Sequence, residues 1–418
     1  MRTAPPSVAG FTLAELLVVV AVLSATALAA FGLVSEDRAQ VRIDDTRNRL
    51  AVLRRAVIGP EAPVYGGEMR LAGYVADNGR LPRNLGELLG AAEEDYLLRK
   101  GVTPKLAAKV DAKCFQQMDG GDDDEDKDKA VELGNAARVL KGHRGNYLAS
   151  AARGGEFRDG WGNVGSVEAE GSSEDSGEKN SEADNFGWHW DETADGLTIT
   201  SFGADNMLDG APPPDLEAEV DQTMRIDDAD WRVPLDGWMV TIRNANAAVS
   251  ETVGSGTGES DADEADSGES GPGGAGTGSA SAGSAFTGDI DPGKFDSSIS
   301  SFNKLGLVLL VFENAGASGR WRQYRSGPPD CGGNNDPDAV LKPGEFCVFR
   351  FVADDDGKIQ CGGAGNSTDA KVPLGRHVLL LAIDNTDSMT LPEEKYRFVT
   401  QVDFFPGALQ PNLVWEVR

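Results

Sequence analysis

The chain begins with an apolar run that gives way to a polar stretch carrying an apolar stripe. Residues 11–34 contain one charge, Glu15, and these 24 residues exceed the about 20 that a membrane-spanning helix needs. After that run, apolar residues recur at spacings of seven, three and four: Ile43, Leu50, Leu53 and Val57. These spacings place them on one helix face. The pattern predicts one long helix over residues 11–58, partly transmembrane, with its stripe packed on a sheet.

The rest of the chain alternates short apolar segments with turn residues. Residues 197–202 alternate as a half-buried strand does, and the apolar segments at 238–242 and 305–312 flank a long acidic stretch of Gly, Ser and Ala at 251–288. Those two segments are able to pair, which would make the stretch a loop inside one β domain. Further strand candidates favour a small antiparallel sandwich: 345–352, 375–383, 396–403 and 412–417.

These patterns predict an α+β chain in four parts. The fold expected is a long, partly transmembrane helix on a small antiparallel sheet, followed by an all-β, sandwich-like C-terminal domain. The predicted parts are a leader (1–10), the long helix (11–58), a globular head (59–236) and a β-rich C-terminal domain (237–418). Two acidic segments inside the head, 119–128 and 168–185, are predicted to be surface loops.

Charge and cysteine content narrow the classes of function. The chain has 39 Lys and Arg against 68 Asp and Glu, a net charge of −29, which argues against a nucleic-acid partner. No cysteine pair has the spacing of a zinc or redox site. Cys331 and Cys361 each begin a Cys-Gly-Gly loop on either side of a strand, so a bridge between them is predicted if the domain lies outside the cytoplasm. Cys347 is predicted to be a buried free thiol.

The N-terminus resembles a known processing signal. A secretory signal has its small-residue cleavage site after the apolar run, whereas here Gly10 precedes it. Residues 10–17 resemble the type IV prepilin leader, which pilins and type II secretion pseudopilins share. The resemblance implies that a prepilin peptidase cuts after Gly10 and methylates Phe11. A carboxylate in hydrocarbon needs an opposite charge, and the amine of Phe11 on a neighbouring subunit would supply it to Glu15 as a register device.

Three blocks of the head resemble major pseudopilins in the family's order. Residues 73–82 resemble the segment that follows the long helix. Residues 142–148 and 158–163 resemble the region of the Asp-Pro-Trp-Gly-Asn turn, with Gly160 in place of the proline. Residues 197–205 resemble the strand that ends in Ser-Leu-Gly-Ala-Asp-Gly. The resemblance covers about residues 10–235 and implies the pilin fold.

The loop after the third block is rich in carboxylates, the hard oxygen ligands that calcium takes. Major pseudopilins carry a calcium site in this loop, and the resemblance implies Ca²⁺ ligands at Asp205 and Asp221, with Asp209 as a third. Asn206 stands where the family has Gly, and a solvated acidic loop is the alternative interpretation.

The sequence therefore predicts a non-enzymatic filament subunit. None of the three histidines, His143, His189 and His377, lies in a catalytic signature. The expected partners are other subunits, the prepilin peptidase, an inner-membrane assembly platform and the inner membrane, with the head in the periplasm or on an extracellular filament. The alternatives are a type IV minor pilin that displays the C-terminal domain as an adhesin, and a membrane-anchored binding protein that does not polymerise.

Overall fold

The computed structural model describes somewhat more than half of the chain. The described residues are 13–60, 64–65, 68–69, 71–90, 99–107, 110–111, 113–116, 131–148, 156–163, 185–204, 222–245, 305–314, 319–331, 344–361, 366–385, 388–391, 398–405 and 412–417. They form two compact units, residues 1–99 with 142–231, and residues 100–141 with 232–418. Residues 100–141, predicted as part of the head, therefore belong to the second unit.

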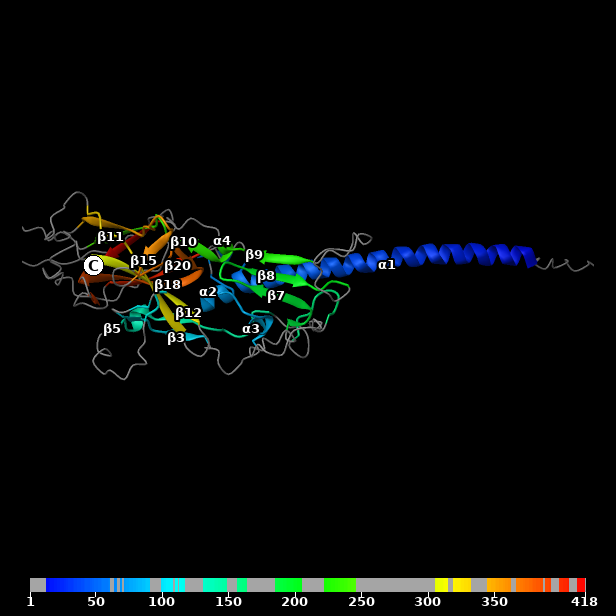
Figure 1. Ribbon diagram of the computed structural model, residues 1–418, viewed down its shortest axis with the longest axis horizontal. Helices are drawn as coiled ribbons and strands as arrows, with labels where there is room; N and C mark the ends of the chain where they lie inside the picture. Colours follow the sequence, from blue (N-terminus) through cyan, green and yellow to red (C-terminus); the bar gives the residue numbers. More distant parts are fainter. Residues whose placement is uncertain are drawn as a thin grey trace, which may run out of the picture. The chain divides into compact units, whose positions relative to one another are not determined.

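The first unit is built on helix α1 (Leu13–Ile58), whose second half lies along strands β7 to β9 (Figure 1). Leu50, Leu53 and Val57 are buried, as the stripe predicted. The three strands form an antiparallel sheet in the order β7-β8-β9. The unit's other elements are β1 (Val64–Tyr65), β2 (Glu68–Met69), α2 (Tyr74–Asn78), α3 (Leu85–Leu89), β7 (Trp188–Glu192), β8 (Leu197–Ser201), β9 (Thr223–Ile226) and α4 (Asp228–Trp231).

The second unit contains one five-stranded and one three-stranded sheet. The first has the order β13-β12-β18-β19, with β20 also paired to β18: β12 (Leu305–Asn314), β13 (Gly319–Arg325), β18 (Gly375–Asn385), β19 (Ser388–Thr390) and β20 (Val399–Phe404). The second has the order β14-β11-β21: β11 (Met239–Asn244), β14 (Phe346–Arg350) and β21 (Leu413–Val417). β11 and β21 are parallel, which a purely antiparallel sandwich does not contain.

Four strand pairs and a short helix complete the second unit. The helix is the 3-10 helix η2 (Asn135–Ala137). The pairs are β10 (Arg232–Pro234) with β17 (Lys371–Pro373), β15 (Lys358–Gln360) with β16 (Ser367–Asp369), β3 (Lys100–Val102) with β6 (Val139–Lys141), and β4 (Lys105–Leu106) with β5 (Val131–Glu132). The predicted pairing of residues 238–242 with 305–312 is wrong, because β11 pairs with β14 and β21 while β12 pairs with β13 and β18.

The expected fold class and the expected single-pass membrane location are both wrong. Among the described residues, about 25% are helical and 41% lie in strands, a mixed α/β composition. No helix among them is long and apolar enough to cross a membrane.

Candidate functional site

The first half of α1 exposes apolar side chains on every side. Successive residues on a helix point about 100° apart, so the consecutive exposed residues from Leu16 to Val20 cover its whole circumference. Side chains with more than half of their surface exposed are Leu13, Leu16, Leu17, Val18, Val19, Val20, Val22, Leu23 and Leu28. Soluble monomers rarely leave a continuous apolar surface of this kind uncovered.

The polar groups in this apolar half are few, and two of them are satisfied within the helix. Ser24 Oγ donates to the carbonyl of Val20 at 2.7 Å, and Thr26 Oγ1 donates to that of Leu23 at 2.9 Å. Glu15 is the one ionisable residue in 13–28, and it lies exposed in the first turn, where the helix dipole favours a negative charge. Gly10 and Phe11, the residues predicted to be cleaved and methylated, lie outside the described residues.

Two glycines bring residues 73–82 against the end of α1. Gly59 and Gly73 both have positive φ, and a Cβ on Gly73 would lie 2.5 Å from the amide nitrogen of Gly59. Gly73 leads directly into α2, and Gly79 ends that helix in the left-handed conformation, with its N–H bonded to the carbonyl of Val75 at 2.7 Å. The Asn78-Gly79 pair therefore forms the C-terminal cap of α2.

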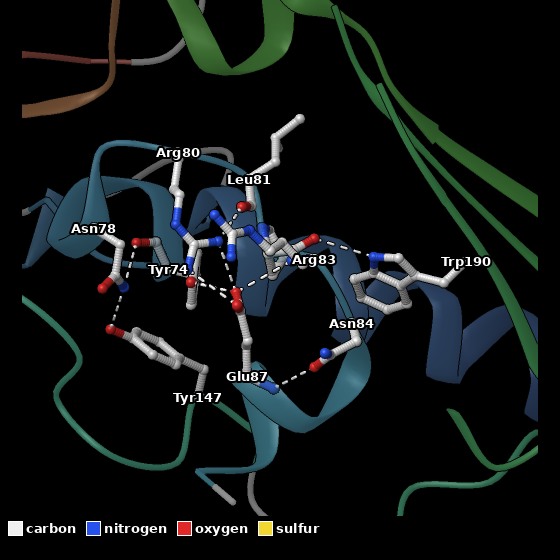
Figure 2. A network of polar contacts seen from close by, with 10 residues as sticks. Tyr74, Asn78, Arg80, Leu81, Arg83, Asn84, Glu87, Tyr147 and Trp190 are labelled. Carbon is white, nitrogen blue, oxygen red and sulfur yellow. Dashed lines mark hydrogen bonds and ion pairs between the residues drawn. The ribbon is translucent and has the colours of Figure 1, made fainter. Parts of the chain in front are cut away.

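A buried ion pair fixes the chain between α2 and α3 (Figure 2). The Glu87 carboxylate, 1% exposed, accepts two hydrogen bonds from the Arg80 guanidinium, at 2.8 and 3.0 Å. It also accepts the hydroxyl of Tyr74 and, at 3.1 Å, the backbone N–H of Arg83. Asn84 caps α3 by accepting the N–H of Glu87 at 3.0 Å. A buried pair with this many donors holds one backbone arrangement.

Residues 142–148 are tied to α2 through Asp77. The Tyr147 hydroxyl donates to Asp77 Oδ2 at 3.1 Å, and the N–H of Gly142 donates to the Asp77 carbonyl at 2.8 Å. Burial, with the Asp77 charge, raises the pKa of Tyr147 well above its usual range, so the hydroxyl remains a donor. Burial lowers the pKa of the neighbouring His143. Two of the sequence blocks thus meet in one polar cluster.

Residues 158–163, the second part of the middle block, meet the third block around Asp159, which is 2% exposed. Its carboxylate accepts the Ser201 hydroxyl at 2.7 Å and, from Asn163, the backbone N–H at 3.0 Å and the side-chain amide at 2.8 Å. The Asn163 amide also donates to the carbonyl of Gly203 at 2.9 Å. This cluster joins the turn at 158–163 to the end of β8. The three aspartates predicted to bind calcium, Asp205, Asp209 and Asp221, lie outside the described residues, and the described ones contain no group of three or more metal-ligating side chains.

Gly160, which replaces the family's proline, packs directly on α1. Its N–H donates to Thr46 Oγ1 at 3.0 Å, a bond that proline is unable to make. A Cβ at this position would lie 2.3 Å from the carbonyl oxygen of Arg42. Beside it, the Arg42 guanidinium lies 5.6 Å from the ring centre of Trp161. The lack of a Cβ at Gly160 therefore allows this turn to pack directly against the helix backbone.

The predicted cysteine pairing is wrong. The structure pairs Cys331 with Cys347 and Cys114 with Cys361, so Cys347 is buried as predicted but is not a free thiol. Asp330 bridges Val348 through two backbone hydrogen bonds, which brings the Cα atoms of Cys331 and Cys347 to 4.1 Å. The Cys-Gly-Gly loops from which the Cys331–Cys361 pairing was predicted carry no signal of this backbone bridge. Cys114 lies 247 residues from its partner, and no local pattern links the two.

Comparison with known proteins finds no matching family, no related curated protein and no similar solved structure. The function must therefore be argued from the chain's own residues.

Proposed function

We propose that this chain is the structural subunit of a pilus-like filament, assembled through the apolar first half of α1. The observation that supports this most is the exposure of that helix on all sides. Covering nine large apolar side chains that are each more than half exposed would contribute on the order of 10 kcal/mol per subunit. A stripe on one face would suit a single partner helix, whereas an apolar surface on every face suits several neighbours at once.

The polar groups of the segment support the same proposal. Since Ser24 and Thr26 bond to carbonyls of their own helix, their hydroxyls need no partner from another chain. In a packed bundle, the Glu15 carboxylate would lie close to the N-terminal amine of a neighbouring subunit, cut by a prepilin peptidase before Phe11. An ion pair of this kind selects one helix register more than it adds net stability. The resemblance of the head to major pseudopilins favours a pseudopilin-like subunit.

A pair of substitutions tests the proposal in the cell that makes the filament. Glu15→Leu removes the register-setting charge and is expected to abolish incorporation, seen by electron microscopy and by immunoblot of sheared filaments. Asp44→Asn is the control, since Asp44 is also an exposed acidic residue of α1 but lies outside the apolar half. Glu15→Leu filaments indistinguishable from the wild type would refute the role of Glu15.

A second measurement tests the processing that the leader implies. Mass spectrometry of the mature N-terminus should show Phe11 as the first residue, carrying one methyl group, and a Gly10→Leu chain should keep its leader. A wild-type chain that retains residues 1–10 inside filaments would contradict the proposed cleavage after Gly10. That result would not contradict helix packing, which the Glu15→Leu variant tests separately.

A further inference from the structure

Two edge strands of the five-stranded sheet in the second unit, β13 and β20, are covered by chain segments from one insertion. An uncovered edge presents unpaired N–H and C=O groups, to which another strand is able to add. Both covering segments come from residues 100–141, which interrupt the first unit in sequence and belong to the second unit in space.

The β13 edge is covered by residues 114–116, which run antiparallel to it. Phe115 bridges Arg322, with the N–H of Gln116 donating to the Trp321 carbonyl at 2.8 Å and the N–H of Gln323 donating to the Cys114 carbonyl at 3.0 Å. These bonds continue the sheet by one short strand.

Side chains hold this added strand in place. The Phe115 ring is 4% exposed and lies 3.7 Å from the Arg320 guanidinium and 4.4 Å from that of Arg322, measured to the ring centre. Such stacked cation–π contacts are stabilising when they are desolvated. The side-chain amide of Gln323 also donates to the carbonyl of Ala107 at 2.7 Å, so the contact extends along the insertion.

The β20 edge is covered by the other end of the same insertion. Helix η2 lies beside β20, and the side-chain amide of Gln401 donates to the carbonyl of Arg138 at 3.0 Å. Lys141, a few residues further along, is fully buried.

The Cys114–Cys361 disulfide fixes the insertion covalently next to the β13 edge. Both sulfur-bearing residues are fully buried, and they form a small apolar cluster with Val110. The side chain of Asn366 also donates to the Val110 carbonyl at 3.4 Å.

We propose that residues 114–116 and 135–138 form an edge strap, which covers β13 and β20 of the five-stranded sheet and is locked by Cys114–Cys361. Without the lock, residues 114–116 leave β13, whose edge then accepts the same segment from a second copy of this chain, because that segment already fits β13. This inference does not depend on the filament function, because every contact that carries it lies within the second unit.

Hydrogen exchange of the full chain in mild detergent tests the strap. Cys114→Ala with Cys361→Ala should raise amide exchange in peptides that contain Gln116 and Gln323 by roughly 100-fold. Cys331→Ala with Cys347→Ala is the matched control, because it removes the other disulfide and should leave those two peptides as in the wild type. Unchanged exchange in the first variant, or equal acceleration in both, would overturn the lock.

A binding measurement tests the strand-addition surface itself. A fluorescent peptide of residues 110–116, carrying Cys114→Ser, should bind the lock variant and not the wild type, as read by anisotropy. Lack of binding to a folded lock variant would overturn the proposed surface. If that variant fails to fold, Phe115→Ala keeps the disulfide and removes the stack, and it should accelerate exchange at the same two peptides. Unchanged exchange in Phe115→Ala would then refute the proposed edge contact.

Discussion

Gly160 offers a sharp test of how the turn at residues 158–163 packs on α1. A Cβ added here would lie 2.3 Å from the Arg42 carbonyl oxygen, 2.6 Å from Thr46 Oγ1 and 2.8 Å from the Thr46 nitrogen. Two of these three atoms belong to the helix backbone, which has no rotamer to change. Gly160→Ala should therefore force the turn away from the helix.

The expected cost follows from these distances. Overpacking of a close contact typically costs 1–3 kcal/mol, so about 2 kcal/mol is expected for Gly160→Ala. Gly160→Pro also loses the hydrogen bond to Thr46 Oγ1 and should cost about 1 kcal/mol more. Adding Thr46→Ala should not rescue Gly160→Ala, since the two backbone contacts persist.

Hydrogen exchange in peptides from β8 measures this effect within the first unit. A loss of about 2 kcal/mol corresponds to roughly 30-fold faster exchange when opening is at equilibrium. Gly306→Ala is the control, because a Cβ there has no atom within 4 Å. Wild-type exchange in Gly160→Ala, or full rescue by Thr46→Ala, would refute the reasoning.

Three further outcomes follow from the described contacts. Loop entropy predicts that loss of Cys114–Cys361 lowers the free energy of unfolding by about 5 kcal/mol and loss of Cys331–Cys347 by about 3 kcal/mol, because their loops span 247 and 16 residues; equal losses in urea titrations would contradict this. Glu87→Leu leaves the Arg80 guanidinium buried without its carboxylate and should cost about 3–5 kcal/mol, whereas an unchanged melting temperature would show that the pair is dispensable. Burial lowers the pKa of His377 far below its usual value, so the folded chain keeps it neutral while the unfolded chain binds a proton below about pH 6.5. Stability should therefore fall as the pH drops below about 6.5, and His377→Gln should lessen the difference in melting temperature between pH 7.5 and 5.5.

Local sequence patterns predicted where the strands lie better than they predicted which strands pair with each other. The strand candidates at 345–352, 375–383, 396–403 and 412–417 correspond to β14, β18, β20 and β21, because alternation and turn residues are local signals. The pairing of β11 with β14 and β21 was not predicted, since a strand's own pattern shows which face is buried but not which strand lies beside it.

The strap and the disulfides had no local signal at all. Residues 100–141 lie between segments of the first unit in the sequence, and for that reason they were predicted to belong to the head. The contacts described for them are with β13 and β20 of the second unit. Cys114 was overlooked for the same reason. Glu15, by contrast, was found from sequence because a lone carboxylate in an apolar run is conspicuous without any knowledge of tertiary structure.

The central claim is that the apolar half of α1 packs against several copies of itself. The structure places all four native cysteines in disulfides, so Val19→Cys introduces a single thiol in that segment. Treating assembled material with a bismaleimide crosslinker, followed by denaturing electrophoresis, measures the contact directly. Each crosslinker joins two thiols, so one cysteine per chain gives covalent dimers. We expect these dimers to form in assembled Val19→Cys chains. We expect them to disappear when Glu15→Leu is added. Monomers alone in assembled Val19→Cys chains, or the same dimers with Glu15→Leu, would contradict it.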